Sequence, residues 1–380
     1  MMKIVIAPDS FKESLSALEA ANAIEKGFKS IFPSAEYRKM PMADGGEGTV
    51  QSLVEATNGT IEERTVTGPL GEPVQAFFGL MGDGQTAVIE MAAASGLHLV
   101  PAEKRNPMIT STRGTGDLIA AALDLGVEHL IIGLGGSATN DGGAGMVQAL
   151  GGKLLDEKGK DIGPGGGSLS QLASVDLSGL DPRLKNVHIE VACDVDNPLT
   201  GPRGASAIFG PQKGASPEMV KILDQNLAHF ADVAEAAIGK PYRNIEGAGA
   251  AGGIGGSLLA FLNADLKRGI DIVLSAVDFE TEVKDADLVI TGEGQIDSQT
   301  IYGKTPIGVA KAAKKYGVSV IGLAGSLSDD CHVVHEHGID ALFSIVPGTI
   351  TLPQAIEQAA IYMERTARNI AASMKIAQKI

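Results

Sequence analysis

The stretch His129-Leu-Ile-Ile-Gly-Leu-Gly-Gly-Ser-Ala-Thr-Asn-Asp-Gly-Gly-Ala-Gly145 indicates the class of fold that this chain adopts. Its first four residues form an apolar run typical of a buried strand, and a helix is expected over 144–150. Glycine gives up side-chain burial and costs backbone entropy on folding, so its repeated use between strand and helix favours close backbone approach to an anion. Together with Ser137 and Asp141, this loop predicts a phosphate or carboxylate site near a metal.

The two ends of the chain repeat the alternation of short apolar strands and helices. The expected strands are 4–7, 37–40, 287–291, 318–322 and 341–345, and the expected helices are 16–31, 305–316, 329–336 and 352–374. The first helix should begin with a capping box, because Ser16 precedes Glu19 by three residues. Apolar strands that alternate with helices indicate a parallel sheet covered on both faces.

The middle of the chain differs, with short alternating strands expected at 61–66, 74–79 and 86–91, and a long helix at 216–238. This pattern predicts a second α/β domain inserted into the first. Residues 1–60 and 286–380 then form one discontinuous domain, and residues 61–285 form the inserted mixed α/β domain.

Composition excludes several classes of partner. The 380 residues carry a net charge of −15, with no Trp and 4% aromatic residues, so neither nucleic-acid backbones nor anionic membranes are expected as partners. Cys193 and Cys331 provide no disulfide framework and no metal-ligand spacing. With no signal peptide or membrane-spanning run in sight, we expect a cytoplasmic protein.

Polar residues follow the first two strands, where the carboxyl ends of a parallel sheet bind ligands. Asp9, Ser10 and Lys12 come after the first strand, and Lys12 can bind a phosphate as a mobile point charge. Asp44 and Glu47, in a glycine frame after the second strand, can present oxygens to Mg²⁺. The alternative for both loops is capping of the helix that follows.

Three further loops carry candidate side chains. Arg113 is a planar donor suited to a carboxylate, or else an ordinary surface arginine. Asp194, which ends a strand, can accept a proton from a substrate hydroxyl or hold a metal, whereas an Asx-turn is the alternative. Glu293 and Asp297 lie among glycines in what is expected to be a loop after residue 291, with capping again the alternative.

Two other motifs lack the surrounding sequence that their usual function requires. The segment 247–256 contains a formal G-x-G-x-x-G without a good preceding strand, and Gly303-Lys-Thr305 lacks the first glycine of a P-loop because Ser298 stands there. His129, His188 and His332 lie in unrelated sequence contexts, so a hydrolase with a nucleophilic triad is unsupported.

These loops, in this order, resemble the type 1 glycerate kinase family over essentially the whole chain, and the chain is similar to bacterial glycerate 2-kinases. The motifs that carry the resemblance are 7–14, 43–49, 135–143, 208–214, 247–253 and 289–294. The resemblance implies transfer of the γ-phosphoryl group of ATP to D-glycerate, giving 2-phosphoglycerate, with Mg²⁺. It also implies two α/β domains, one of them flavodoxin-like and built from both chain ends, with the active site in the cleft between them.

The loops and the resemblance together lead to a set of expected roles. Lys12 and Asp194 are expected to be catalytic, and Arg113, Asp9 and Ser10 to bind substrate. The remaining residues are Gly135, Gly136, Ser137, Asp141, Gly292 and Gly294 for nucleotide phosphates, and Asp44, Glu47 and Glu293 for the metal. Alternatives are phosphorylation of the 3-hydroxyl, a kinase for another small hydroxy acid, and a non-catalytic sensor of a small acid or nucleotide. A monomer or homodimer is expected.

Overall fold

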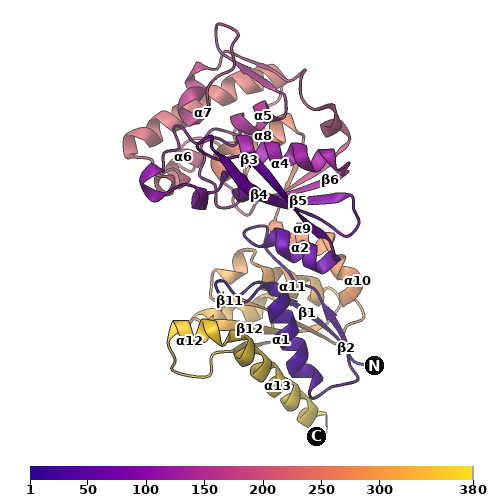
Figure 1. The fold of residues 1–380 in the computed structure, drawn as a ribbon. Coiled ribbons are helices and arrows are strands. Elements are labelled where there is room, and N and C mark those ends of the chain that lie inside the picture. The colour runs from indigo at the N-terminus through magenta and orange to yellow at the C-terminus, as the bar shows by residue number, and fades with distance from the viewer. Residues whose placement is uncertain (379–380) are drawn as a thin grey trace. The chain divides into compact units, whose positions relative to one another are not determined.

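The computed structural model describes residues 1–378, and its chain divides into two compact units (Figure 1). The first unit comprises Met1–Asp44, Gln51–Asn58 and the chain from Ile270 onward, and the second comprises Gly45–Val50 and Gly59–Gly269. The chain re-enters the first unit ahead of the expected boundary at 285/286. The reason is local packing, because a Cβ built on Gly308 would lie 2.2 Å from Cγ1 of Ile270.

The first unit contains a parallel sheet in the order β13-β12-β11-β1-β2. This is the flavodoxin-like order 2-1-3-4-5, so the prediction of a parallel sheet built from both chain ends is confirmed. The strands are β1 (Lys3–Pro8), β2 (Glu36–Lys39), β11 (Leu288–Ile296), β12 (Ser319–Leu327) and β13 (Ala341–Ser344). The α-helices are α1 (Ala17–Lys29), α2 (Thr49–Thr57), α9 (Gly269–Ala276), α10 (Phe279–Val283), α11 (Thr305–Lys314), α12 (Leu352–Glu357) and α13 (Ala359–Ala377), of which α2 and α9 begin in the second unit.

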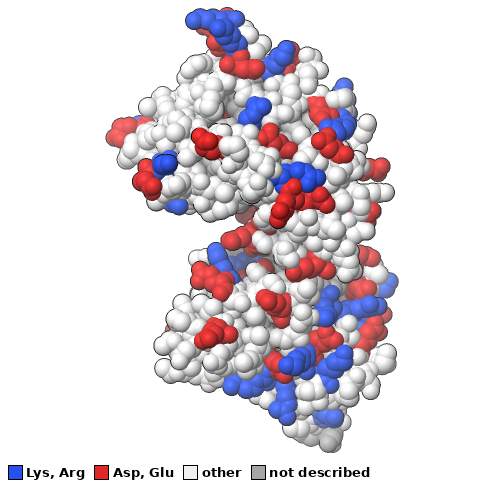
Figure 2. Space-filling model, viewed as in Figure 1, with Lys and Arg blue, Asp and Glu red and all other residues white. Residues whose placement is uncertain are grey.

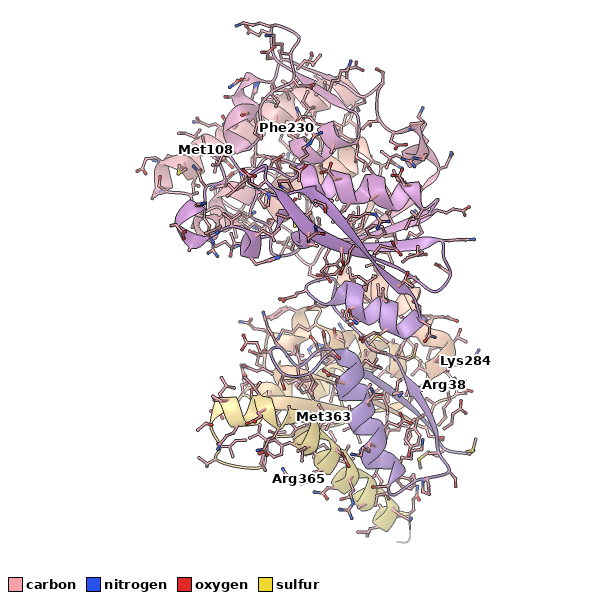
Figure 3. All side chains as sticks on the ribbon, in the orientation of Figure 1. Arg38, Met108, Phe230, Lys284, Met363 and Arg365 are labelled. Atoms are coloured by element: carbon pink, nitrogen blue, oxygen red, sulfur yellow. The ribbon has the colours of Figure 1, made fainter. Side chains whose placement is uncertain are left out.

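Helices α1 and α13 pack side by side over one face of this sheet (Figure 1). The capping box at the start of α1 is present, because Ser16 Oγ accepts from the N–H of Glu19 and the Glu19 carboxylate accepts from the N–H of Ser16. Met363 of α13 is fully buried against the sheet (Figure 3). At Gly27 the helices approach so closely that a Cβ would lie 2.4 Å from the carbonyl oxygen of Glu364.

Three expectations for the first unit are wrong. Strand β11 continues to Ile296, so Gly292, Glu293 and Gly294 lie in a strand and not in a loop. Gly292 permits this, because a Cβ there would lie 2.1 Å from the carbonyl oxygen of Leu323 on β12. The helix expected at 329–336 is the 3₁₀ helix η7 (Cys331–His337), and the one expected at 352–374 is divided into α12 and α13 at Gln358, whose φ of −107° and ψ of 12° are not helical.

The second unit contains a mixed sheet in the order β10-β9-β6-β5-β4-β3, together with a small β7-β8 ladder. The first four strands run parallel, whereas β4 is antiparallel to both of its neighbours. The strands are β3 (Thr60–Thr67), β4 (Pro73–Leu80), β5 (Thr86–Glu90), β6 (His129–Gly133), β7 (Lys153–Leu155), β8 (Ser174–Asp176), β9 (His188–Ala192) and β10 (Asp265–Lys267). The α-helices are α3 (Ala92–Ser95), α4 (Arg113–Asp124), α5 (Ala144–Ala149), α6 (Ala205–Phe209), α7 (Pro217–Ile238) and α8 (Ala250–Phe261). The inserted mixed α/β architecture is therefore confirmed.

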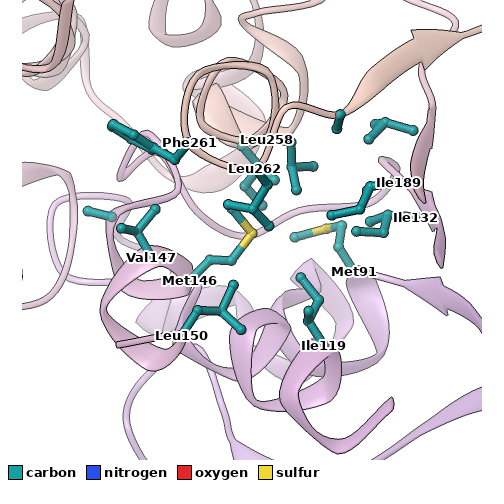
Figure 4. Packing of buried hydrophobic residues seen from close by; sticks show 14 of the residues in the cluster. Met91, Ile119, Ile132, Met146, Val147, Leu150, Ile189, Leu258, Phe261 and Leu262 are labelled. Atoms are coloured by element: carbon teal, nitrogen blue, oxygen red, sulfur yellow. The ribbon is translucent and has the colours of Figure 1, made fainter. Parts of the chain in front are cut away.

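The core of the second unit lies between this sheet and its helices (Figure 4). Ile132 and Ile189 of the sheet, with Met91 directly after β5, meet three helical residues in one buried cluster: Ile119 of α4, Met146 of α5 and Leu258 of α8. Phe230 of α7 is also fully buried, in the same cluster (Figure 3). A single apolar layer of this kind holds the carboxyl ends of β6 and β9 rigidly, which is what a loop-built site needs.

Acidic and basic side chains are interspersed over the face of the molecule in Figure 2, so the net charge of −15 does not come from one large acidic patch on that face. Within residues 1–378, no helix combines the length and the apolar character that crossing a membrane requires.

Candidate functional site

Two partly buried carboxylates lie in the first unit, one directly after β1 and one in the carboxyl-terminal half of β11. Asp9 follows β1, and its N–H donates to the carbonyl oxygen of Gly292 over 2.8 Å, which places it beside β11. Its carboxylate accepts from the N–H of Ser10 over 2.6 Å and from the hydroxyl of Thr305. Glu293 accepts from the hydroxyl of Thr300 over 2.8 Å, and Lys304 Nζ lies 3.5 Å from its Oε2.

Both carboxylates resist ionisation. Burial raises the pKa of the Asp9 carboxyl to about 6, and nearby Asp44 adds to the rise while the Thr305 hydroxyl opposes it. Burial also raises the pKa of Glu293 to about 7, with Lys304 opposing the shift and Asp9 contributing to it. Titratable groups perturbed in this way concentrate at functional sites.

The donor set of this cluster fits Mg²⁺. Asp9 interacts unfavourably with both Asp44 and Glu293, so the three carboxyl groups are near enough for their charges to interact. Mg²⁺ is a hard cation that binds one or two carboxylates together with phosphate oxygens. Glu47, the other acid expected to bind metal, is exposed and belongs to the second unit.

The remaining expected residues of the first unit surround this cluster. Lys12 is exposed, and a Cβ on Gly294 would lie 3.5 Å from its backbone nitrogen, so β11 and the 9–12 loop are adjacent. Asp297 accepts from the N–H groups of Gln299 and Thr300 over 2.9 and 3.2 Å, so its carboxylate is hydrogen-bonded to the turn that follows it.

In the second unit, Gly135 and Gly136 follow β6 and leave backbone donors open. No other residue within 1–378 accepts a hydrogen bond from the N–H of either glycine. Gly136 has a φ of 66°, a left-handed conformation that favours glycine. A Cβ on Gly135 would meet nothing nearer than Gly46 Cα at 3.8 Å. This is the local arrangement that an anion-binding loop requires.

Asp141 has a different position from the one expected. Its fully buried carboxylate accepts from the N–H and the hydroxyl of Thr112, both over 2.9 Å, and from the N–H groups of Gly143 and Gly145. Burial raises its pKa, and these donors oppose the rise. Asp141 therefore connects the residues before α4 with those at the start of α5, and its carboxylate oxygens accept hydrogen bonds from the chain.

Lys213 is the residue that the sequence analysis missed. It is 1% exposed, and its Nζ donates to Ser137 Oγ over 2.7 Å and to the carbonyl oxygen of Thr139 over 2.6 Å. Burial lowers the pKa of Lys213 to about 7, while Asp141 opposes the shift. Its motif, 208–214, is one of those that carry the family resemblance, and a lysine in Gly-Pro-Gln-Lys-Gly was the available signal.

Other glycines of the loop serve packing. Gly142 and Gly143 have φ values of 63° and 80°, and a Cβ on Gly253 would lie 2.8 Å from Gly142 Cα. A Cβ on Gly252 would lie 2.0 Å from the carbonyl oxygen of Thr139. The glycine-rich segment at the start of α8 therefore packs closely against the backbone of the Ser137 loop.

Asp194 and the Glu47 loop lie at the carboxyl end of β9. Asp194 is exposed, and its Oδ1 accepts from the N–H of Gly269 over 3.1 Å. A Cβ on Gly45 would lie 2.8 Å from Gly269 Cα, so the 45–48 loop adjoins the same strand end. The Glu90 carboxylate lies at the start of α2, where it accepts a hydrogen bond from the N–H of Val50 over 2.9 Å.

Arg113 begins α4 and is exposed, with its N–H donating to Ser111 Oγ over 3.2 Å. It lines a cavity of about 460 Å³ together with Ile109, Asp161 and Gln148. The residues that line this cavity do not include Gly135, Gly136 or Ser137.

The chain is an α/β protein with a parallel flavodoxin-like sheet and an inserted mixed sheet, and polar or glycine-rich segments lie toward the carboxyl ends of their parallel strands, where such proteins bind small ligands. The model of the glycerate kinase family matches residues 4–375, and the chain belongs to that family. It is a phosphotransferase that acts on an alcohol group of glycerate.

Full-length relatives agree with this assignment. The chain is 75% identical over 377 residues to a glycerate kinase of Bacillus subtilis, covering 99% of each chain. It is 61% identical over 378 residues to a glycerate 2-kinase of Escherichia coli, covering 100% of this chain and 99% of the other. The fold matches a crystal structure of a protein assigned as glycerate kinase 2 from Salmonella typhimurium LT2, with a TM-score of 0.94, 58% identity and full coverage of both chains.

Proposed function

We propose that this chain transfers the γ-phosphoryl group of ATP to the 2-hydroxyl of D-glycerate and releases 2-phosphoglycerate and ADP. The observation that carries the choice of hydroxyl is the 61% identity with the glycerate 2-kinase of Escherichia coli over the whole chain. Membership in a kinase family supports ATP as the phosphoryl donor. Free Cys193 and Cys331 support a reducing, cytoplasmic location. We propose that the chain is a monomer or a homodimer, and mass measurement in solution distinguishes the two.

Phosphoryl transfer depends on positioning and charge neutralisation more than on covalent chemistry. We assign the open N–H groups of Gly135 and Gly136 to oxygens of the nucleotide phosphates. Ser137 accepts a hydrogen bond from Lys213, so its own proton is available to a phosphate oxygen. Gly292 and Gly294 of β11 are assigned to the same nucleotide, although Gly292 also has a packing role.

The acidic groups would hold the metal that accompanies ATP. Asp44, Glu47 and Glu293 are the proposed Mg²⁺ ligands, and the bound ion would neutralise charge on the phosphate oxygens. Lys12 supplies a mobile positive charge to the same oxygens. Asp141 is assigned to the support of the phosphate loop, because four donors of the chain already occupy its oxygens.

The acceptor substrate needs a cation for its carboxylate and a base for its hydroxyl. Arg113 is proposed to bind the glycerate carboxylate, with Asp9 and Ser10 contacting the hydroxyl groups. Asp194 is proposed to accept the proton of the attacking hydroxyl as the new P–O bond forms.

Phosphorus NMR of the products tests the proposal. The purified chain is incubated with Mg-ATP and D-glycerate, and the phosphate ester is examined with proton coupling. A doublet from one carbon-bound proton, with ADP formed in equal amount, is the expected result. A triplet from two protons would move the reaction to the 3-hydroxyl.

Absence of an ester from D-glycerate would contradict glycerate as the substrate. The same assay with other small hydroxy acids then decides whether the chain phosphorylates a relative of glycerate. A matched incubation with GTP and with L-glycerate measures the preference for each substrate.

A further inference from the structure

Two histidines that lie far apart in the sequence meet at the amino ends of β6 and β9, two neighbouring strands of the second sheet. His129 begins β6 and His188 begins β9, and the parallel register pairs them directly. Their rings stack with centroids 5.0 Å apart. Glu190 lies two residues after His188 and therefore on the same face of the sheet. Sequence context had separated these histidines, and strand pairing brings them together.

The three side chains direct ligand atoms into one small volume. Glu190 Oε2 lies 2.8 Å from His129 Nε2, and Glu190 Oε1 lies 3.9 Å from His188 Nε2. One ligand atom from each residue can be chosen so that all three lie within 4.8 Å of one another. His129 Nε2 is buried against the Glu190 carboxylate, and this contact is a close ion pair and not a well-aligned hydrogen bond. A buried imidazole nitrogen beside a carboxylate oxygen, without hydrogen-bond geometry, is a suitable position for a cation.

We propose that His129, His188 and Glu190 bind a divalent transition-metal ion of the zinc class. Two imidazole nitrogens and one carboxylate are a common ligand set for Zn²⁺ and less suitable for Mg²⁺, which takes oxygen ligands. Metal–ligand bonds of about 2.0–2.2 Å place neighbouring ligand atoms about 3–3.5 Å apart. His129 and Glu190 already approach this spacing. His188, whose side chain is 54% exposed, needs only a small movement to reach it.

A lysine competes for the same carboxylate. Lys267 of β10 forms an ion pair with Glu190 Oε1, and its side chain is 48% exposed. Asp265, on the same strand, has an oxygen 4.0 Å from His188 Nδ1 and supplies a further carboxylate at the rim. A metal ion can bind Oε2 of Glu190 while the Lys267 side chain moves away toward solvent. Removal of Lys267 should therefore strengthen metal binding.

This site is separate from the one proposed for phosphoryl transfer. His129 and His188 begin their strands, whereas Gly133 and Ala192 end them at the edge that carries the Gly135 loop. A strand rise of about 3.3 Å per residue separates the two edges by about 13 Å. The bound metal would stabilise the pairing of β6 with β9, and the proposal does not depend on the identity of the substrate.

Calorimetric titration of the metal-free full-length chain with Zn²⁺, in excess Mg²⁺, tests the proposal. The excess of Mg²⁺ occupies oxygen-rich sites such as the Asp9 cluster. We expect saturable binding of one Zn²⁺ per chain, with a visible absorption band when Co²⁺ replaces it, which reports nitrogen ligation. His188→Ala and Glu190→Gln should each weaken binding at least tenfold.

Two further variants separate the metal site from an ordinary ion-pair cluster. Lys267→Met should tighten Zn²⁺ binding several-fold, whereas loss of an ion pair without a metal site would leave the affinity unchanged. His332→Ala, an exposed histidine of the first unit, is the control and should bind Zn²⁺ as the original chain does. Absence of saturable binding, or an affinity that His188→Ala does not alter, would overturn the proposal.

Discussion

At the scale of single residues, the chemistry of the Ser137 loop depends on a lysine that solvent does not reach. Lys213 Nζ donates to both Ser137 Oγ and the carbonyl oxygen of Thr139, so one side chain sets the path of the loop and orients a hydroxyl. Because Lys213 Nζ is buried, water cannot replace a lost hydrogen bond, and substitutions near it should strongly affect the Ser137 loop. We regard Lys213 as a positioning residue for the phosphate site.

Lys213→Met should lower kcat/KM for ATP by about 10²-fold, because the Ser137 loop would lose the side chain that holds it in position for the phosphates. Because burial lowers the pKa of Lys213 to about 7, the ammonium form is present below that pH and is lost above it. The original chain should therefore show KM for ATP rising through pH 7, and Lys213→Met should abolish that dependence. Steady-state kinetics from pH 6 to pH 8 provide the measurement.

Lys221→Met, at an exposed position on α7, is the matched control and should leave both parameters unchanged. If Lys213 has only a structural role, Lys213→Met should lower stability and leave the pH dependence of KM for ATP unchanged. That result would exclude Lys213 as a positioning residue for the phosphate site.

The proposed base has a close internal control. Asp194→Asn keeps an oxygen for the N–H of Gly269 but removes the negative charge, so kcat should fall by about 10²–10⁴-fold while ATP binding persists. Asp196→Asn alters an exposed carboxylate that pairs with Arg203, and it should change kcat little. Equal losses in both variants would contradict the assignment of Asp194 as the base.

At the scale of elements, close packing decides where glycine is required. Glycine inside a helix is normally unfavourable by about 1 kcal/mol relative to alanine. Gly27 lies inside α1, yet α13 approaches it within 2.4 Å of where a Cβ would be, at the carbonyl oxygen of Glu364. The contact between the two helices therefore outweighs the local helix propensity.

Gly27→Ala should destabilise the chain by about 1–3 kcal/mol, because added volume in a packed contact forces the helices apart. Urea unfolding with an unchanged m value is the measurement. Lys29→Ala, exposed on the same helix, is the control and should change stability little. A gain in stability for Gly27→Ala would show that propensity dominates at this site.

At the scale of the whole molecule, partly buried carboxylates make stability depend on pH. The pKa of Glu293 rises from an ordinary 4.5 to about 7, so the folded chain binds more protons than the unfolded chain between those values. Stability contributed by the protonated form is complete below pH 4.5 and is lost as pH rises through 7. A cation bound at the cluster reverses this loss, because it favours the ionised form.

Glu293→Gln should therefore raise the melting temperature at pH 8 and leave it nearly unchanged at pH 4, with a difference on the order of 1 kcal/mol between the two conditions. Addition of Mg²⁺ should stabilise the original chain more than the variant. Glu63→Gln, at an exposed carboxylate of β3, is the control for scanning calorimetry. A variant less stable than the original chain at pH 8 without Mg²⁺ would refute the expected sign.

The sequence by itself determined the alternation of strands and helices at the two chain ends, the inserted architecture and most of the loops that carry charge. These features depend on local patterns: apolar runs for β1 and β6, the Ser16 capping box for α1, and glycines at strand ends. Patterns of this range act over a few residues, so they are visible before the chain folds.

Only the tertiary structure decided which residues share a site. Strand pairing placed His129 against His188, and the α8 support and Lys213 reached the Ser137 loop from more than seventy residues away in the chain. Asp141 changed from an expected phosphate contact to a buried anchor because Thr112 and two glycines surround it. Burial, hydrogen-bond saturation and pKa depend on neighbours in space, and no local pattern specifies them.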